Sequence, residues 1–248
     1  MIILSILFFI TAILYSSVGF GGGSTYLALL LIWDIPYYIF PVIALLCNII
    51  VVSGNSFNYI RAGNHNFKLI LPFLMGSVPL AFFGGTLKID KDIFEILLFF
   101  ILSIAGILLL INNKSYENNN LIIKKLNFLI SLVIGSILGL ISGIVGIGGG
   151  IFLSPILFLL KAEKPKIIVT TASLFILVNS ISGVFGQLTK ENIITEISNY
   201  IPLFICVFLG GLLGNYLNLR IFTSRVLAVI TALLVMFVSI RMGIRIYL

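Results

Sequence analysis

The sequence predicts an all-α, polytopic membrane protein. Of its 248 residues, 60% are hydrophobic and 9% are charged, and the mean hydropathy of +1.24 lies well outside the range of soluble domains. The apolar runs are continuous over helical lengths, whereas the strands of a membrane barrel would alternate apolar and polar residues. The lipid bilayer is therefore an expected partner.

The net charge of +7 is modest and is spread over many short polar segments. It favours contact with anionic head groups at one membrane face. It forms no basic stripe of the kind that binds nucleic acid, so no nucleic-acid partner is expected.

Two uncharged runs each carry a glycine motif. Met1 to Trp33 contains Gly-Phe-Gly-Gly-Gly-Ser-Thr at residues 19–25, and Asn127 to Leu160 contains Gly-Ile-Gly-Gly-Gly-Ile-Phe at residues 146–152. About 20 helical residues, rising about 1.5 Å each, already span the hydrocarbon core of about 30 Å. Each run is too long for one straight span, and each glycine costs about 1 kcal/mol in a helix. Both runs are expected to break at their glycines into two helical arms.

Three further helices are expected in the first half, over about residues 39–60, 69–87 and 93–111. The first of them is unusually polar for a membrane helix. The second contains the pair Gly84-Gly85, and small residues let membrane helices approach closely. A polar, asparagine-rich stretch follows. The predicted organisation is a first repeat over 1–112, a linker over 113–126 and a second repeat over 127–248.

The second half repeats the order of the first: a broken segment, then helices over about 167–188 and 199–217 and from about 226. Matching features lie 125 to 130 residues apart, and they are Gly19 with Gly146, Asn55 with Ser180, Pro72 with Pro202, and Gly84 with Gly214. Internal repeats of this kind are typical of transporters.

The distribution of Lys and Arg distinguishes two topologies. If each broken segment crosses the membrane once, the two faces carry eight and seven of these residues, which gives no orientation. If each broken segment enters and returns to its own side, the split is ten to five. The second topology is favoured. It makes the two repeats inverted, with a cytoplasmic linker and both termini outside.

The glycine motifs have two interpretations. A helix that resumes after Gly23 or Gly150 directs its free N–H groups and positive dipole end toward the break, which suits the oxygens of an anion. Alternatively, the glycines permit a kink or a close helix crossing. Two copies of a glycine triplet favour the anion site. The expected binding residues here are Gly21, Gly22, Gly23, Ser24, Gly148, Gly149 and Gly150.

Neutral polar residues lie on the helix after each motif. Amides and hydroxyls can replace water around an oxyanion without adding a buried charge, although interhelical hydrogen bonding is the simpler explanation for any one of them. Asn48 and Ser173 occupy matching positions, 125 residues apart, which favours that pair. The candidates for the site are Asn48, Asn55, Ser173 and Asn179, with Ser56 and Ser180 as their polar neighbours.

Several absences restrict the chemistry. No Asp or Glu lies deep in an expected span, so coupling through a buried acid is not supported. His65 is the only histidine and falls in a polar segment, and Cys47 and Cys206 are isolated within apolar runs, so neither a metal site nor another cofactor is expected. An intramembrane hydrolase would need a nucleophile beside a base, and no Gly-x-Ser-x-Gly motif occurs. No catalytic residue is expected, and the protein is not expected to be an enzyme.

The second glycine motif continues as far as Leu-Ser-Pro at residues 153–155. It is followed by Thr-Thr-Ala-Ser-Leu-Phe at 170–175 and by Leu-Gly-Gly-Leu-Leu-Gly at 209–214. Together with the first motif, these stretches resemble the sulfite exporter TauE/SafE family of membrane permeases over essentially the whole chain. The sequence departs from the family pattern at Ala172 and at Cys47-Asn48.

The resemblance implies a multi-pass permease of the bacterial cytoplasmic membrane that moves sulfite, sulfonates such as sulfoacetate, or related organic anions, with export as the expected direction. The leading hypothesis is a permease for a small anionic solute, with its site between the two glycine breaks. The alternatives are a permease for a non-sulfur carboxylate and a membrane subunit or scaffold that transports nothing.

Overall fold

The computed structural model describes residues 1–17, 19–33, 35–111, 123–124, 126–190 and 193–217, together with 233, 236, 240, 243 and 244. Within these residues the regular elements are all helical. In chain order they are α1 (Ile2–Ser16), α2 (Gly23–Ile32), η1 (Tyr37–Ile39), α3 (Phe40–Arg61), α4 (Phe67–Thr86), α5 (Lys91–Ile111), α6 (Phe128–Val145), α7 (Gly150–Leu159), α8 (Pro165–Gln187), α9 (Ile193–Ile197), η3 (Ser198–Tyr200) and α10 (Ile201–Leu217).

The predicted breaks are confirmed. The first uncharged run forms α1 and α2, and the second forms α6 and α7, with the glycines between each pair of arms. The predicted helices after each break correspond to α3, α4, α5, α8 and α10, and every end agrees within two residues. The short elements η1 and α9 were not predicted, and η3 falls largely within the helix predicted over about 199–217. The predicted final helix from about residue 226 and most of the predicted linker lie outside the described residues.

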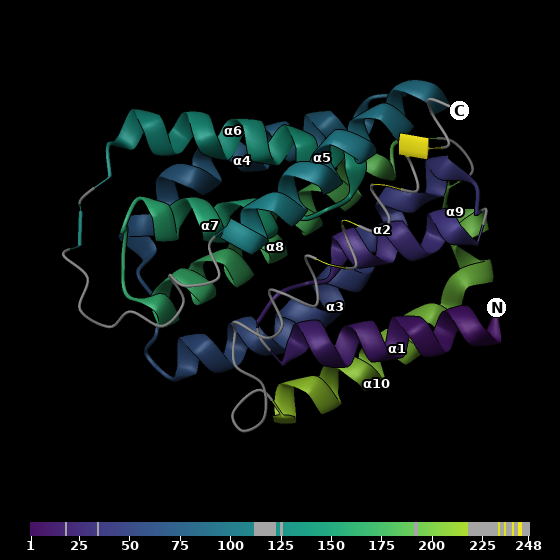
Figure 1. Ribbon diagram of the computed structural model, residues 1–248, viewed down its shortest axis with the longest axis horizontal. Coiled ribbons are helices and arrows are strands. Elements are labelled where there is room, and N and C mark those ends of the chain that lie inside the picture. Colours follow the sequence, from purple (N-terminus) through teal and green to yellow (C-terminus); the bar gives the residue numbers. More distant parts are fainter. Residues whose placement is uncertain are drawn as a thin grey trace.

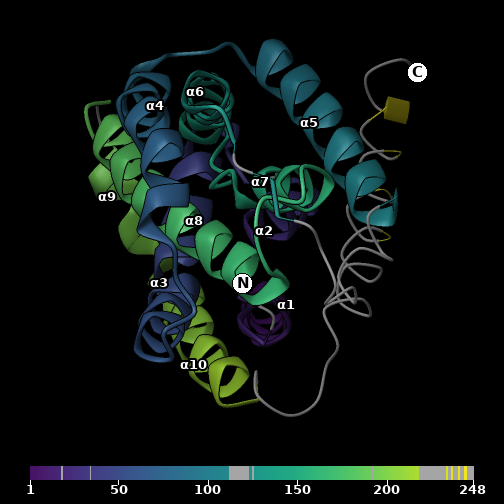
Figure 2. The same cartoon turned by 90° about the vertical axis from the view of Figure 1, so that its left-hand side faces the viewer.

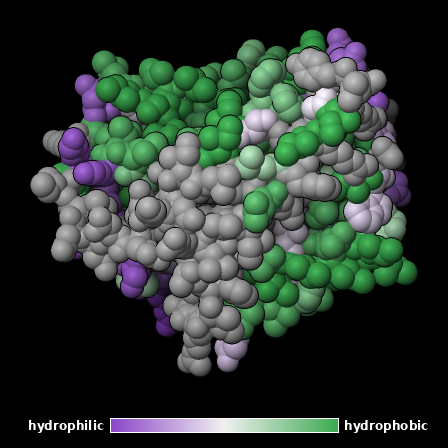
Figure 3. Space-filling model, in the orientation of Figure 1, coloured by the Kyte–Doolittle hydropathy of each residue, from purple (hydrophilic) through white to green (hydrophobic). Residues whose placement is uncertain are grey.

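Five of the described helical segments are long and apolar enough to cross a membrane, and α1, α2 and α7 are shorter apolar helices. Figure 3 shows hydrophobic residues over much of the visible face and hydrophilic residues near its two ends. This distribution suits a molecule whose long sides contact lipid and whose ends contact water.

The helices α4, α6 and α8 run in the same direction. In each pair of helices, residue numbers rise in the same direction from one contact to the next. The contacts are Phe73 with Gly135 and Ala81 with Gly143 between α4 and α6, and Val78 with Ser182 and Phe82 with Gly186 between α4 and α8. Glycine allows this proximity, because a methyl group on Gly135, Gly143 or Gly186 would collide with the facing backbone.

The helices α1, α3 and α10 run in the opposite direction. The contacts that align them are Phe9 with Gly210 and Ile13 with Gly214 between α1 and α10, and Val51 with Gly211 and Asn58 with Asn215 between α3 and α10. The pairs Leu45 with Gly183 and Ser56 with Ser173 show that α3 is antiparallel to α8.

These directions determine the course of the chain at each break. Because α1 and α3 start at the same end of the molecule, α2 must lead back toward the end from which α1 came. Because α6 and α8 both start at the other end, α7 must return there (Figure 1). We refer to the end at which α1 and α3 begin as the N-terminal end.

The helices α3 and α8 form the centre of the bundle. In their most apolar windows of 18 residues, 61% and 67% of residues are buried, against 28% to 39% for α4, α6 and α10. Figure 2 shows α8 in the middle of the view, with α4 and α6 on one side of it and α1 and α10 on the other. The polar residues that the sequence predicts on the helices after the breaks therefore lie on the two most buried of the five long apolar helices.

Candidate functional site

The first break runs from the end of α1 to Gly23. Gly19 and Gly22 have positive φ angles of 85° and 87°, which L-residues with side chains rarely adopt, and Gly22 is the N-cap of α2. Tyr15 of α1 and Thr25 of α2 share a hydrogen bond of 2.6 Å between their hydroxyl oxygens. This bond fastens the two arms together across the break.

The second break has the same design. Gly146, Gly148 and Gly149 have φ angles of 90°, 82° and 75°, and Gly149 is the N-cap of α7. Both α2 and α7 are ten residues long, and neither receives a hydrogen bond from an N-cap side chain. The first helical N–H groups at each break are thus left to other partners.

Consecutive backbone N–H groups at each break have no hydrogen-bond acceptor among the described residues. In the first break they belong to residues 21–24 and in the second to residues 147–151. Successive free N–H groups at a helix N-terminus form a concave, positively polarised surface that favours anions. Each break can therefore offer donors to an oxyanion without a charged side chain.

Asn48 of α3 joins the two breaks. Its side chain is fully buried, and its Nδ2 donates to the carbonyl oxygen of Ile147 at 3.2 Å. A methyl group on Gly23 or on Gly148 would lie 2.8 Å from Nδ2, and one on Gly21 would collide with Oδ1. Glycines from both motifs thus surround a single amide.

The Oδ1 atom of Asn48 has no hydrogen-bond partner in the described structure. An unsatisfied buried acceptor costs about 1–3 kcal/mol, so a partner is expected. A water molecule or a bound solute can supply the missing hydrogen bond. The hydroxyl oxygens of Ser24 and Ser180 are also buried and have no hydrogen-bond partner in the described structure. These are the kinds of group that can exchange hydrogen bonds with a solute inside a membrane.

On α8, Ser180 and Ile176 approach the second break. A methyl group on Gly148 would lie 3.2 Å from Ser180 Oγ and 2.9 Å from Ile176 Cγ2. Asn179 behaves differently, because its Nδ2 donates to the carbonyl oxygen of Phe175 one turn back along the same helix at 2.8 Å. Ser180 therefore has a better position for the site than Asn179.

The other matched residue, Ser173, is separate from Asn48. Its Oγ lies 3.1 Å from that of Ser56 on α3, and both side chains are buried. Asn55 is also fully buried on α3, seven residues or about 10 Å along the helix from Asn48. The matching positions in the sequence do not place Asn48 and Ser173 in one cluster.

The structure thus brings together Gly21, Gly23, Gly148 and Asn48, whereas Gly22 and Gly149 shape the backbone. Sequence reasoning missed two contributors. Ile176 could have been found, because it lies one turn from both Ser173 and Ser180 on the same helix face. The carbonyl of Ile147 could not, because every residue carries a carbonyl group.

The described residues hold no group of three or more His, Cys, Asp and Glu side chains that could bind a metal. Cys47 is buried, and Cys206 is partly exposed. Three acidic side chains near helix ends have a partner: Glu95 pairs with Lys91, Glu163 accepts from Asn66, and Glu196 accepts from Tyr38.

Comparison with known proteins identifies relatives over almost the full length. The family profile described as "Sulfite exporter TauE/SafE" matches residues 4–242. The chain is 25% identical over 243 residues to "Probable membrane transporter protein y4hK" of Sinorhizobium fredii, covering 96% of each chain. It is 21% identical over 263 residues to "Probable membrane transporter protein YunE" of Bacillus subtilis, covering 95% of this chain and 94% of that one. No solved structure matches the chain.

Proposed function

The chain belongs to the sulfite exporter TauE/SafE family, and from this premise we propose that it exports a small anion of the sulfite or sulfonate type across the bacterial cytoplasmic membrane. Its family, the names of its relatives and its apolar spans establish a multi-pass membrane protein and indicate a transporter rather than an enzyme. The site that we propose lies between the two glycine breaks.

The observation that carries this proposal is the position of Asn48 between both breaks. The N-termini of α2 and α7 each have N–H groups with no acceptor in the described part of the chain, and glycines of both motifs approach this one amide. Two helix dipoles that meet with their positive ends would repel each other if the space held no negative charge. An oxyanion placed there would accept hydrogen bonds from both breaks and would relieve the repulsion.

We further propose that the two halves are inverted repeats, so that the site lies at the repeat interface, as in many transporters. Two contacts support this. Gly84 of α4 lies against the carbonyl of Leu140, and Gly214 of α10 lies against the carbonyl of Ile13. Leu140 follows Ile13 by 127 residues, the same separation as the glycine motifs, and each contact joins one half to the other. The opposite directions of α3 and α8 agree with an inversion.

The experiment is to reconstitute the purified protein in liposomes and measure transport of sulfite, sulfoacetate, sulfate, taurine and small carboxylates, with binding per folded molecule measured in detergent. Asn48→Leu keeps the approximate volume and removes both polar atoms. We expect it to weaken anion binding at least tenfold, since hydrogen bonds to charged groups contribute about 1.5–3 kcal/mol. Transport should decline with binding.

Ser77→Ala is the matched control, because Ser77 on α4 also buries an unpartnered hydroxyl but contacts α6 away from Asn48. It should bind as the wild type does. If folded Asn48→Leu protein bound anions with wild-type affinity, the proposal that the site lies at the glycine breaks would be wrong. Transport of carboxylates without sulfur anions would change the substrate class, and a wild-type protein that transports none of these solutes would support a scaffold or subunit.

A further inference from the structure

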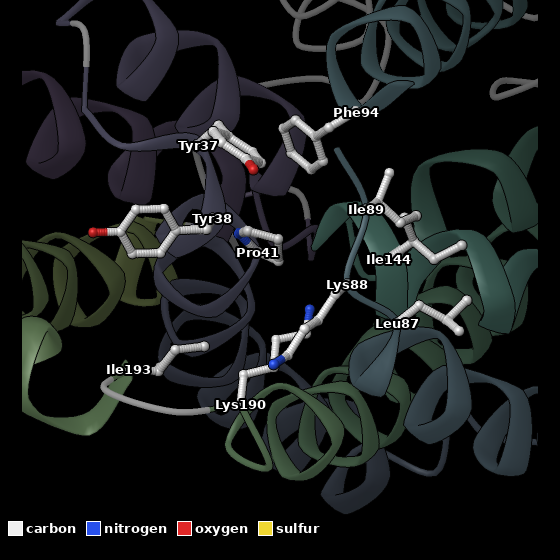
Figure 4. A pocket seen from close by; sticks show the side chains of 10 residues that line it. All are labelled: Tyr37, Tyr38, Pro41, Leu87, Lys88, Ile89, Phe94, Ile144, Lys190 and Ile193. Carbon is white, nitrogen blue, oxygen red and sulfur yellow. The ribbon is translucent and has the colours of Figure 1, made fainter. Parts of the chain in front are cut away.

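A cavity of about 390 Å³ opens at the N-terminal end of the molecule, away from Asn48. Its walls come from η1 and the start of α3, from the segment between α4 and α5, from the end of α6 and from the segment after α8. Its volume lies within the range of small-molecule sites, about 300–1,000 Å³. Most of its lining is aliphatic or aromatic, and it includes two lysines, Lys88 and Lys190 (Figure 4).

The two ammonium groups are directed toward the space between them (Figure 4). Lys190 Nζ donates to Gln187 Oε1 at 2.8 Å, and the buried Gln187 donates through Nε2 to the carbonyl of Gly143 at 2.7 Å. Neither lysine forms an ion pair with a described carboxylate. Burial, followed by the charge of Lys88, lowers the pKa of Lys190 to about 8. Two cations held together without a described counter-ion favour an incoming anion.

The inner wall of this cavity adjoins the second glycine break. Pro41 and Ile144 line the cavity, and a methyl group on Gly146 would lie only 2.7 Å from the carbonyl oxygen of Pro41. Asn48 lies seven residues further along α3, which is about 10 Å. A solute held in the cavity would therefore be about two helical turns from the amide between the breaks.

We propose that this cavity is a second, outer binding site for an organic anion that combines one acidic group with a short apolar portion. Lys88 and Lys190 bind the acidic group, and the apolar portion packs against Phe94, Ile144 and Ile193. Binding in the cavity follows from its own residues, whereas its role as the docking position next to the glycine breaks rests on the proposed function.

The test measures binding of methanesulfonate, propane-1-sulfonate and butane-1-sulfonate to the purified full chain by calorimetry. In the wild type, affinity should rise by up to about fourfold per added methylene group, because each buried methylene contributes about 0.8 kcal/mol. Lys88→Gln and Lys190→Gln should each weaken butane-1-sulfonate binding to the cavity about tenfold, and the double variant should keep only the binding that the site at the glycine breaks contributes. Lys88→Arg and Lys190→Arg keep the charge and should keep most of the affinity.

Lys91→Gln is the matched control, because Lys91 is an exposed lysine at the same end that pairs with Glu95 outside the cavity. It should bind as the wild type does. Ile89→Trp fills the cavity without altering its charge and should also prevent binding there. Equal butane-1-sulfonate affinity in the wild type, Ile89→Trp and the double lysine variant would overturn the proposal, as would the absence of binding by the wild type.

The dependence on pH provides a second readout. As the pH rises from 7 to 9, Lys190 loses its proton through its pKa of about 8, so wild-type binding should weaken. The other titratable groups facing the cavity are Lys88, Tyr37 and Tyr38, and Tyr38 donates to Glu196 of α9 at 2.6 Å. Lys190→Arg retains all of them and remains charged, so its binding should stay nearly constant. An identical decline in Lys190→Arg would assign the titration elsewhere and overturn the role of Lys190.

The outcomes distinguish this site from the proposed function. If the double lysine variant loses butane-1-sulfonate binding but the wild type transports no anion, the outer site stands and the permease proposal fails. If the wild type transports sulfite and Asn48→Leu does not, while the lysine variants bind alkylsulfonates normally, the outer site fails and the permease proposal stands.

Discussion

At the scale of single residues, the geometry around the two glycine breaks depends on positions where glycine carries no side chain. Asn48 can reach Ile147 only because Gly21, Gly23 and Gly148 carry no Cβ atom in its path. Gly22 has a different role, since its φ of 87° turns the chain into α2. Substitutions at these two kinds of glycine should therefore fail for different reasons.

The first prediction concerns Gly22→Ala. Left-handed backbone costs an alanine about 1–2 kcal/mol, and the new methyl group would lie 3.1 Å from the Tyr15 ring and 3.2 Å from that of Tyr26. Gly63→Ala is the control, because Gly63 has a φ of 73° but no atom within 4 Å of the added carbon. We expect Gly22→Ala to lower the melting temperature in detergent more than Gly63→Ala. Equal melting temperatures would contradict the tight packing of the break.

The second prediction concerns Gly21→Ala, whose backbone lies outside the left-handed region. Its methyl group would displace Asn48 Oδ1, so we expect folded protein with anion affinity reduced at least tenfold. Binding per folded molecule, measured beside Gly22→Ala, separates a changed site from a lost fold. Folded Gly21→Ala protein with wild-type affinity would show that the position of Asn48 does not matter for binding.

At the scale of helices, close pairs hold the bundle together through glycine. The apolar surfaces of these helices are as compatible with lipid as with each other, so association depends on close packing and on hydrogen bonds rather than on the hydrophobic effect. The α1 and α10 pair illustrates both: Gly214 lies against the carbonyl of Ile13, and Ser16 Oγ donates to the carbonyl of Gly211 at 2.8 Å.

The third prediction compares two glycines of α10. Gly214→Ala would force α1 and α10 apart, because its methyl group would collide with the carbonyl oxygen of Ile13. Gly211→Ala has its nearest neighbour at 3.7 Å, in Val51, and should gain up to about 1 kcal/mol from helix propensity. Thermal unfolding in detergent should show a lower melting temperature for Gly214→Ala and an unchanged or higher one for Gly211→Ala. The reverse order would mean that the two helices are not held at this distance.

At the scale of the whole molecule, helix directions place the two broken segments at opposite ends. The first broken segment begins with α1 at the N-terminal end and returns to that end through α2. The second begins with α6 at the other end and returns there through α7. A return of each broken segment to its own end is the feature on which the topology with ten basic residues against five depends, and that topology stays a prediction. The starts of α4 and α5 lie at opposite ends of the molecule.

The fourth prediction is that the linker after α5 is cytoplasmic and both termini are outside. In a Cys206→Ser background, Lys91→Cys at the start of α5 should react with a membrane-impermeant thiol reagent added outside intact cells, and Lys68→Cys at the start of α4 should not. Both lysines are exposed, and Cys47 is buried. A reporter fused after Leu248 that is active only in the cytoplasm, or labelling of Lys68→Cys alone, would reverse the orientation.

The features that depend on local composition could be predicted from the sequence. Apolar runs longer than one span, interrupted by residues that disfavour helix, were sufficient to locate both breaks, and the polar side chains of the helix over 39–60 were sufficient to identify it as unusual. The resemblance in the glycine motifs was also sufficient to identify the family.

Which of these residues contact one another became evident only from the packing of the helices. Asn48 bonds to Ile147, 99 residues away, whereas its sequence match Ser173 pairs with Ser56. Likewise, Lys88 and Lys190 belong to segments with no sequence relation, yet both line one cavity. Such contacts depend on the rotation and direction of packed helices, which are set by close approaches of backbone at particular glycines. Those approaches join residues far apart in the chain, so no local pattern records them.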